Sequence, residues 1–534
     1  MKLFVFLSGP IAVGKSGFCA ELSRRSGAMV LSTRQILLQS GAQNEREALI
    51  KRGEELDEKT KGKWVADGVE KVLKNSGPDV IIVDCVRTSD QIRHLRAMAL
   101  HRRIRVHHVH LVANYATLRK RYLERDSQVR EFEDYRPAWE SPIEAKAREL
   151  QSLADIVVPT DSSSSASQVA RAMAGCGIFP SAPERTVDVI VGAQYGSEGK
   201  GNICAYLAAE YDILMRVGGP NAGHKVAHPP YKYVQLPSGT GSNPRARILI
   251  GAGATIWLPQ MLKEIKDQGL SGERLFIDPQ AMMIEQADRK EETGPLSRIG
   301  STKQGVGIAT ARKIVGRDGQ AHYGSKVRLA KDIAELNDFT KVPVSEKLEE
   351  AYARSLRIML EGTQGTSLSL HHGSWPHVTS RETTASGCLA DAGIAPTRAR
   401  RIVMVTRTYP IRVGGVSGPM EGEISYEAVA QRSGLDVADI RATEVGSVSG
   451  VPRRVGEFEW EQVRRAAALN GATDVALTFA DYLNSENRAA YRYEQLATET
   501  KDFIADVERV TNAPVSLIST WFSERAVIDR RTWR

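Results

Sequence analysis

Short apolar runs separated by segments with helical spacing dominate the N-terminal part of the chain. The runs cover residues 3–7, 80–83, 106–112 and 156–158, and histidines interrupt the third run. From Lys15 onwards, the apolar positions after the first run follow the helical period. Strands that alternate with helices predict a parallel sheet with helical crossovers. We therefore expect an α/β domain over residues 1–162.

The composition changes after this domain. Residues 161–167 read Asp-Ser-Ser-Ser-Ser-Ala-Ser, and residues 179–185 contain two prolines. Both features are typical of a linker, although a short helix fits between them. A new apolar strand at 187–191 opens a second domain. We therefore predict a linker at 163–185 and a second domain at 186–534.

Composition and charge narrow the range of partners. The residues are 42% hydrophobic and 25% charged, which is ordinary for globular domains. The chain of 534 residues is too long for a single domain. The net charge of +8 is dispersed, so we expect small phosphorylated ligands and no nucleic acid. The five cysteines show no metal spacing and no disulfide framework, which favours a reducing cytoplasm. No apolar run reaches the ~18 residues of a membrane span, so no membrane partner is expected.

The segment from Gly9 to Ser16 reads Gly-Pro-Ile-Ala-Val-Gly-Lys-Ser and matches the phosphate-binding pattern G-x-x-x-x-G-K-S/T. It follows an apolar strand and opens a helix, as the pattern requires. Gly9 and Gly14 allow backbone N–H groups to close around phosphate oxygens, and the helix N-terminus adds partial positive charge. We expect Lys15 to reach the β- and γ-phosphates of ATP and Ser16 to ligate Mg²⁺.

The segments after this loop resemble the acceptor side of the nucleoside monophosphate kinases. Ser32-Thr33-Arg34 lies where those enzymes place an arginine on the acceptor phosphate, and residues 84–91 resemble their D-G-F-P-R-T-x-x-Q segment. Asp84, at a strand end, can hold the water shell of Mg²⁺, and Arg87 can bind a phosphate through two hydrogen bonds. The remaining candidates are Gln91, which would read a base edge, and Arg125, which would close over the transferring phosphoryl group. A solvated basic face explains the stretch around Arg125 equally well.

A second glycine-rich loop follows the strand at 187–191. Residues 189–201 read Val-Ile-Val-Gly-Ala-Gln-Tyr-Gly-Ser-Glu-Gly-Lys-Gly, and residues 218–224 read Gly-Gly-Pro-Asn-Ala-Gly-His. In this order they resemble the adenylosuccinate synthetases, which open with V-G-A-Q-W-G-D-E-G-K-G-K and G-G-N-N-A-G-H-T. Further matches to that family lie at 300–307, 361–366, 372–380, 383–385, 450–454, 477–481 and 519–520. The two resemblances imply two P-loop-type three-layer α/β domains with mainly parallel sheets, the second larger and with additional helical and β subregions.

The second resemblance implies a two-step ligation. An NTP phosphorylates O6 of a purine monophosphate, and the amine of L-aspartate then displaces that phosphate to leave an N6-succinyl purine. Phosphate leaves far more readily than a carbonyl oxygen, which explains the first step. His224 would protonate or polarise the 6-oxygen. Charge on the transferring phosphoryl group would be stabilised by Lys200 and by the loop glycines Gly196, Gly199 and Gly201.

The family motifs also imply the remaining contacts. Nucleotide contacts are implied for Asn221, Thr302, Lys313, Thr379, Asp481 and Ser519. A catalytic role is implied for Gln364. The candidates for the amino-acid substrate are Ser449, Arg453 and Arg454. Gly223, through its carbonyl, and Ser197 would help to hold Mg²⁺. The donor would be ATP, dATP or GTP, and a homodimer through this domain is expected because synthetases of this family dimerise.

Four positions depart from the family pattern. Ser197 replaces an aspartate that takes the proton from purine N1 and ligates Mg²⁺, and a serine hydroxyl is no such base at neutral pH. The other three departures are Val451 for an arginine that binds the substrate carboxylate, Phe479 for a lysine beside Asp481, and Trp521-Phe522 for Gly-Pro in the base-contacting tail.

Three interpretations follow from these departures. The serine is similar to that of the phage 2-aminoadenylosuccinate synthetases, which accept dGMP and tolerate ATP or dATP. We favour dGMP or GMP as the acceptor, because the retained His224, Lys200, Gln364 and Asp481 argue against decay. Ordinary IMP-dependent synthesis and a non-catalytic nucleotide sensor stay open. The fusion suggests consecutive steps, in which the N-terminal domain phosphorylates a nucleoside or nucleotide.

Overall fold

The computed structural model describes residues 3–73, 80–125, 132–178, 184–294, 298–446, 450–523 and 525–533. The chain divides into two compact units, Met1–Ala182 (unit 1) and Pro183–Arg534 (unit 2). Within the described ranges, no helix is both long and apolar enough to cross a membrane.

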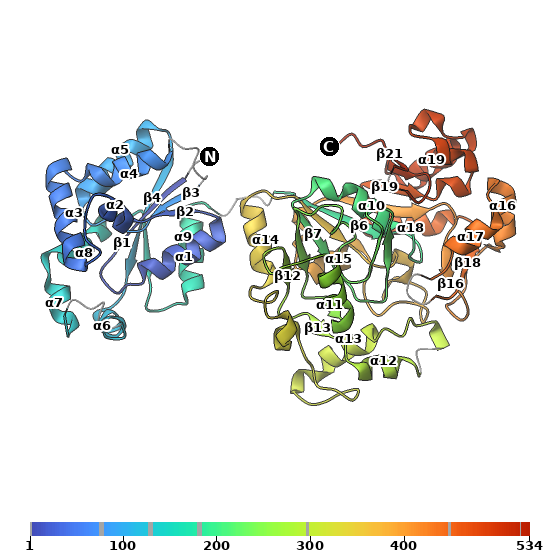
Figure 1. Ribbon diagram of the computed structural model, residues 1–534, viewed down its shortest axis with the longest axis horizontal. Helices are drawn as coiled ribbons and strands as arrows, with labels where there is room; N and C mark the ends of the chain where they lie inside the picture. The colour runs from blue at the N-terminus through green and yellow to red at the C-terminus, as the bar shows by residue number, and fades with distance from the viewer. Residues whose placement is uncertain are drawn as a thin grey trace. The chain divides into compact units, whose positions relative to one another are not determined.

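Unit 1 is built on a five-stranded parallel sheet with the order β2-β3-β1-β4-β5 (Figure 1). Its strands are β1 (Leu3–Ser8), β2 (Met29–Leu31), β3 (Val80–Val83), β4 (Arg105–Val112) and β5 (Ile156–Pro159). Four of them coincide with the apolar runs of the sequence. The prediction missed β2, which has only three residues, none of them fully buried.

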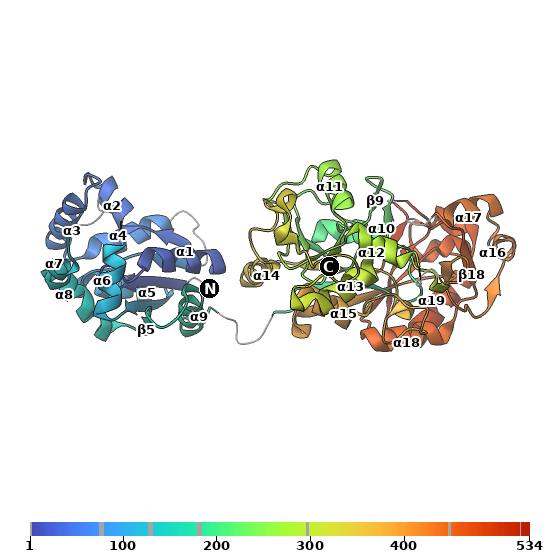
Figure 2. The same ribbon diagram turned by 90° about the horizontal axis from the view of Figure 1, so that it is seen from below.

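Helices cover both faces of this sheet (Figure 1 and Figure 2). Val5 and Leu7 of β1 share an apolar cluster with α1 (Lys15–Ser26) and α9 (Ser165–Gly175). Phe4 and Phe6 point to the opposite face, as alternation along a strand requires, and share a second cluster with α4 (Lys63–Leu73) and α5 (Ser89–His101). The remaining helices are α2 (Thr33–Gln39), α3 (Arg46–Thr60), α6 (Tyr115–Leu123), α7 (Tyr135–Glu140) and α8 (Pro142–Glu149).

Helix α9 lies inside the segment expected to be a linker. Its residues Val169, Ala172 and Met173 recur at helical spacing and are buried in the same apolar cluster as α1. Unit 1 therefore extends beyond residue 162, and the segment between the units is shorter than the expected 163–185.

Unit 2 contains a nine-stranded sheet with the order β12-β10-β7-β14-β6-β15-β19-β20-β21. Only β21 runs antiparallel to its neighbour. The strands are β6 (Val187–Gly192), β7 (Ile213–Arg216), β10 (Arg247–Ile250), β12 (Leu275–Ile277), β14 (Ile358–Glu361), β15 (Ala399–Arg407), β19 (Asp474–Thr478), β20 (Val515–Ser519) and β21 (Val527–Asp529). Apolar clusters lie on both of its faces, which is why its strands appear as continuous apolar runs.

Helices pack around this sheet and around three smaller sheets (Figure 1). The smaller sheets pair β8 (His224–Val226) with β9 (Tyr231–Tyr233), β11 (Thr255–Ile256) with β13 (Met282–Met283), and β18 (Arg453–Gly456) with β16 (Ile411–Val413) and β17 (Glu423–Ile424). The helices are α10 (Lys200–Leu207), α11 (Leu258–Asp267), α12 (Gln286–Glu292), α13 (Val306–Val315), α14 (Val344–Ala353), α15 (Ala385–Ala392), α16 (Tyr426–Ser433), α17 (Val437–Thr443), α18 (Trp460–Asn470) and α19 (Thr498–Thr511). The carboxyl ends of the parallel strands meet at one edge of the large sheet, where such folds bind ligands.

Candidate active sites

The glycine-rich loop of unit 2 connects β6 to α10. Three of its residues have a left-handed backbone, with φ of 86° at Gly196, 57° at Ser197 and 86° at Gly199. Gly199 caps α10, so the positive end of the helix faces the loop. Only a glycine adopts such angles without strain, which explains the glycines at 196 and 199. The loop is shaped to bring backbone amides close to an anion.

A buried carboxylate holds this loop in shape. The Oε1 atom of Glu198 accepts hydrogen bonds from the backbone N of Gln194 at 3.0 Å and of Gly196 at 2.9 Å. Its Oε2 atom accepts from Nζ of Lys200 at 2.6 Å, and both side chains are buried. Lys200 therefore neutralises a buried charge at the start of α10.

Gly201 brings α10 into direct contact with His224. A Cβ atom at position 201 would lie 2.8 Å from Cβ of His224, which is too close for any side chain. The missing side chain of Gly201 therefore allows His224 to lie against the start of α10.

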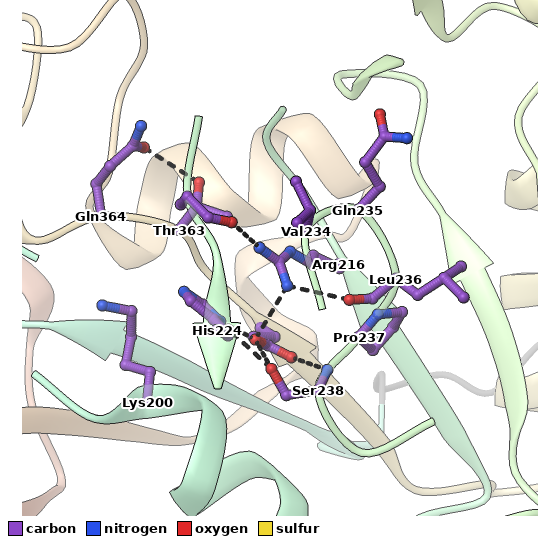
Figure 3. A network of polar contacts seen from close by, with 12 residues as sticks. Lys200, Arg216, His224, Val234, Gln235, Leu236, Pro237, Ser238, Thr363 and Gln364 are labelled. Atoms are coloured by element: carbon purple, nitrogen blue, oxygen red, sulfur yellow. Dashed lines mark hydrogen bonds and ion pairs between the residues drawn. The ribbon is translucent and has the colours of Figure 1, made fainter. Parts of the chain in front are cut away.

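His224 belongs to a network of polar side chains centred on Glu361 (Figure 3). Its Nδ1 atom hydrogen-bonds with Oε1 of Glu361, which also accepts from Oγ of Ser238 at 2.6 Å. The Oε2 atom of Glu361 accepts from the backbone N of Ser238 at 2.7 Å. Arg216 lies on the other side, with Nη1 at 3.6 Å from Oε1 of Glu361. The elements that supply this network are β7, β8, β14 and the segment after β9.

The network sets the charges at neutral pH. Burial, together with the charge of Arg216, lowers the pKa of His224 to about 4, and Glu361 opposes this shift. Burial alone would raise the pKa of Glu361, but His224 and Arg216 hold it at about 2. In the ligand-free protein the imidazole is therefore neutral and the carboxylate is ionised.

Three predicted nucleotide contacts converge beside this network. Oγ1 of Thr379 accepts from Nε2 of Gln364 at 3.1 Å and from Nδ2 of Asn221 at 3.4 Å. The Oδ1 atom of Asn221 is buried and has no hydrogen-bond partner among the described residues. Such an atom is costly unless a ligand or water satisfies it, so this cluster is a candidate binding site.

Thr302 and Lys313, the other two candidates for contacts with the acceptor nucleotide, lie outside this cluster. Thr302 lies in the loop before α13, and Gly307 at the start of that helix approaches Ser380, the neighbour of Thr379. Lys313 donates from Nζ to the carbonyl of Gln280 at 2.7 Å and to that of Ala252 at 3.3 Å. The amine of Lys313 therefore holds backbone, which differs from the expected nucleotide contact.

The candidate donor-base region adjoins the loop. Oγ1 of Thr478 donates to the carbonyl of Glu198 at 2.6 Å, and the N–H of Asp481 donates to the carbonyl of Thr520 at 3.1 Å. Ser519 donates from Oγ to the carbonyl of Trp521 at 3.1 Å. The aromatic rings of Trp521 and Phe522 are partly exposed.

Asp481 is the ionisable group of this region. Burial raises its pKa to about 6, although Arg488, whose Nε lies 3.0 Å from Oδ2, opposes the shift. Its Oδ1 atom is buried and lacks a hydrogen-bond partner within the described part of the chain. The guanidinium of Arg407 stacks 3.8 Å from the ring centre of Phe479, the residue that replaces the family lysine.

The predicted amino-acid site lies only in part within the described residues. Ser449 lies outside the described residues. Arg453 donates from Nη1 to the buried Glu444 at 3.2 Å. Arg454 instead donates to Oγ of Ser417 at 3.0 Å, and Ser417 packs against Gly300 of the phosphate-loop candidate. The two arginines alternate along β18, so they face different surroundings.

The residues predicted to bind Mg²⁺ would each contribute one oxygen ligand. The described ranges contain no group of three or more His, Cys, Asp and Glu side chains that fits a metal ion. Mg²⁺ prefers oxygen ligands and usually binds through few protein groups together with phosphates. In unit 1 the hydroxyl of Ser16 and the carboxylate of Asp84 fit this chemistry. In unit 2 the Gly223 carbonyl and the Ser197 hydroxyl are both neutral, so phosphates have to supply the negative charge.

The cradle of unit 1 has the geometry expected of a phosphate loop. Gly9 has a φ of 143°, and a Cβ atom there would lie 2.5 Å from the carbonyl oxygen of Leu111. Gly14, with a φ of 98°, caps α1. Lys15 donates from Nζ to the carbonyls of Gly9 at 2.6 Å and Pro10 at 3.0 Å. Burial lowers the pKa of Lys15, and Arg87 adds to this effect, so phosphate binding would relieve both.

The acceptor side of unit 1 is linked to the loop by Glu144 of α8. Its Oε2 atom accepts from the backbone N of Ile11 at 2.7 Å, and its Oε1 atom lies 3.6 Å from Nη1 of Arg87. Asp84 accepts through Oδ1 from both N and Oγ1 of Thr33 at 2.9 Å. Arg34 is more exposed and donates to Asn44.

Gln91 is used by the chain itself. Its amide oxygen accepts from the backbone N of Arg87 at 2.9 Å, and its Nε2 atom donates to both carboxylate oxygens of Asp57. Gln91 thus ties Arg87 to Asp57 of α3, and its contact with a nucleobase stays a prediction. Arg125 lies near Lys15, whose pKa it helps to lower, and its guanidinium lies 6.0 Å from the ring centre of Tyr122.

Several site residues escaped the sequence prediction, namely Arg216, Ser238 and Glu361 in unit 2 and Glu144 in unit 1. Arg216 and Glu361 are the last residues of β7 and β14. A charged residue that ends an apolar run of a parallel sheet is a usable signal, because those ends line the ligand edge. Ser238 follows an irregular segment and offers no such signal.

Comparisons with known proteins agree with this geometry. A family model described as adenylosuccinate synthetase matches residues 189–324 and 320–490, and one described as an AAA domain matches residues 5–137. The adenylosuccinate synthetase of Methanocaldococcus jannaschii is 38% identical over 358 residues, which cover 65% of this chain and 97% of that protein. That of Pyrococcus horikoshii is 37% identical over 355 residues, which cover 64% of this chain and 98% of that protein.

Two solved structures are similar to unit 2. The succinoaminodeoxyadenylate synthetase (PurZ) of cyanophage S-2L, bound to dGMP and to dATP as an energy donor, has a TM-score of 0.55 at 29% identity. The match covers 65% of this chain and 96% of that chain. Adenylosuccinate synthetase from Plasmodium falciparum has a TM-score of 0.55 at 20% identity, covering 65% of this chain and 100% of that chain, which shows the shared fold alone.

Proposed function

Since the chain belongs to the adenylosuccinate synthetase family, we propose that unit 2 ligates L-aspartate onto C6 of a purine monophosphate at the expense of an NTP, with Mg²⁺. The observation that carries this proposal is that His224, Lys200 and Gln364, which come from three family motifs, lie near one another (Figure 3). Gly201 of the glycine-rich loop packs against His224, and Thr379 accepts hydrogen bonds from Gln364 and Asn221.

The residues match the two steps of such a ligation. In the first step the purine 6-oxygen bonds to the γ-phosphorus, and the bond from that phosphorus to the departing NDP breaks. Lys200 and the loop amides stabilise the charge on the transferring group. In the second step the amine of aspartate bonds to C6 and loses a proton, and the C6–O bond breaks to release phosphate. His224 lies where it can polarise the 6-oxygen.

We infer that the acceptor is dGMP or GMP. Ser197 is shorter than the aspartate of the family and uncharged, which leaves room beside N1 and the 2-amino group of a guanine. The similarity to a phage synthetase that binds dGMP supports this choice. The alternative acceptor is IMP, as the resemblance to the adenylosuccinate synthetases implies.

The replacement of the family lysine by Phe479 favours adenine as the donor base. Asp481 offers only acceptor atoms when it is ionised, which fit the N6 amino group of adenine as well as the N1–H and 2-amino groups of guanine. The 6-oxygen of guanine needs a hydrogen-bond donor instead, and Phe479 supplies none. We therefore expect ATP or dATP to be used in preference to GTP.

Unit 1 is proposed to be a kinase for a nucleoside or nucleotide of the same reaction sequence. The joint placement of Lys15, Asp84 and Arg87 around one loop supports this role. A full-length Lys200→Met variant isolates this activity, because it disables unit 2 alone. Incubation with ATP and a panel of purine nucleosides and monophosphates should transfer phosphate to at least one of them, and failure with all of them would sink the kinase proposal.

Mass spectrometry of reaction mixtures tests the ligase proposal. The full chain is mixed with Mg²⁺, aspartate, ATP or GTP, and in turn IMP, GMP or dGMP. We expect a succinyl adduct on dGMP or GMP, and phosphate release that requires both acceptor and aspartate. An adduct on IMP alone would overturn the acceptor assignment. Tight nucleotide binding without any turnover would instead favour the sensor interpretation. The homodimer stays a prediction that sedimentation velocity checks.

A further inference from the structure

Glu361 has a surplus of hydrogen-bond donors around it. Ser238 donates to it through Oγ at 2.6 Å and through the backbone N at 2.7 Å. Arg216 adds a positive charge 3.6 Å from Oε1, and the side chain of Glu361 is fully buried. A buried carboxylate among several donors stays ionised, so Glu361 presents only acceptor atoms to its neighbours.

This charge determines where the hydrogen of His224 resides. Nδ1 of His224 hydrogen-bonds with an oxygen of Glu361 that has no hydrogen to give. In the neutral ring Nδ1 must therefore carry the hydrogen, and Nε2 keeps a lone pair. Nδ1 of His224 faces Glu361, and Figure 3 shows Lys200 on the same side of the network as His224.

We propose that Glu361 is a positioning residue for His224, which fixes the hydrogen on Nδ1 and aims Nε2 at the purine 6-oxygen. This inference rests on the proposed ligase function. The charged groups around His224 are Glu361 of β14, Arg216 of β7 and Lys200 of α10. The hydrogen bond to the ionised Glu361 holds the ring in one orientation, so Nε2 is the atom left to exchange a proton at the 6-oxygen.

The Glu361→Gln variant distinguishes a positioning role of Glu361 from a merely structural one. The N–H of Ser238 is a fixed donor, so the amide oxygen of the glutamine has to face it. The NH₂ group then faces His224, and Nδ1 becomes an acceptor. We therefore expect the variant to move the hydrogen of His224 from Nδ1 to Nε2. A residue that only anchors Ser238 and Arg216 has no effect on this tautomer.

Nitrogen NMR of the histidine rings in the ¹⁵N-labelled full chain reads the tautomer directly, with His224→Asn to identify the signal. We expect Nδ1–H in the wild type and Nε2–H in Glu361→Gln. The matched control is Glu264→Gln, because Glu264 is equally buried and accepts from the backbone N atoms of Val234 and Leu236. This control should leave the tautomer of His224 unchanged.

Kinetics supply the second measurement. We expect Glu361→Gln to lower kcat by about 10²–10⁴-fold, the usual contribution of general acid–base catalysis, with little change in KM. An Nε2–H tautomer in the wild type, an unchanged tautomer in Glu361→Gln, or an equal loss of kcat in Glu264→Gln would each overturn the proposal. If the wild type forms no succinyl product, the ligase function fails, and the tautomer of the free protein still decides the role of Glu361.

Discussion

The carboxylate of Asp481 should make unit 2 less stable than it would be with a neutral side chain. This group is 3% exposed and ends in a buried oxygen that lacks a partner among the described residues. Asp481→Asn keeps the shape of the side chain and removes its charge. Since the charge is needed only when a donor base is bound, we expect the variant to be more stable near neutral pH and weaker in donor binding.

The size of the effect follows from the pKa of Asp481. Burial raises this pKa from 3.8 to about 6, which corresponds to about 3 kcal/mol once the group is ionised. Between these pH values the unfolded chain releases a proton that the folded state keeps, so the free energy of unfolding falls as the pH rises. Asparagine does not titrate and lacks this fall. The pKa of about 6 already contains the opposing effect of the partly exposed pair with Arg488.

The net advantage of Asp481→Asn should thus be near zero at pH 4 and about 3 kcal/mol at pH 7. Urea denaturation at several pH values, followed by hydrogen exchange of the β19 and β20 peptides, measures the free energy of unfolding of unit 2 separately. Asp474→Asn is the matched control, because Asp474 lies in the same sheet and accepts from Nε1 of Trp533 at 2.7 Å. That variant should be destabilised throughout. A stability difference that is independent of pH, or a less stable Asp481→Asn at pH 7, would refute the reasoning.

Three further substitutions test the assignment of the two sites. Lys200→Met should abolish the succinyl product and lower the free energy of unfolding by about 3–5 kcal/mol, because it leaves Glu198 buried and unpaired. Adding Glu198→Gln to this variant should restore most of its stability in urea but no activity. Ser197→Asp should shift the kcat/KM ratio of IMP to dGMP at least about tenfold toward IMP, since one charged hydrogen bond contributes roughly 1.5–3 kcal/mol, and an unchanged ratio in competition assays by mass spectrometry would contradict the role of Ser197. Lys15→Met should abolish phosphorylation by unit 1 and leave succinyl formation by unit 2 intact, and a loss of both activities would show that the units do not act separately.

The sequence predicted the fold class correctly, and the reasons for its misses are local. The run at 80–83 coincides with β3, because four apolar residues between polar segments, three of them buried, leave little choice. The short β2 has no such pattern and exists because its neighbour β3 offers hydrogen bonds. Helix α9 was expected only as a short helix in a linker, since its serine-rich start conceals the buried stripe formed by Val169, Ala172 and Met173.

The candidate sites were predictable where the motif itself supplies the geometry. Asn221, Gln364 and Thr379 lie in three separate motifs, and the structure brings them together. The role of Gln91 could not be read from its motif, because Asp57 comes from a different helix. The sequence identifies Glu361 only as the first residue of a family motif, since nothing local reveals that His224 lies against it.

The hydrogen bonds of Glu198 have a consequence for how this protein can change over evolutionary time. The loop amides of Gln194 and Gly196 are held by the chain itself, so the loop keeps its shape whichever nucleotide arrives. The residues around the donor base, Phe479 and Trp521, lie outside these hydrogen bonds. Substitutions there can alter which base is accepted without disturbing the machinery for phosphoryl transfer. If unit 2 is the proposed ligase, its donor preference can therefore change by substitution while the shape of the loop is kept.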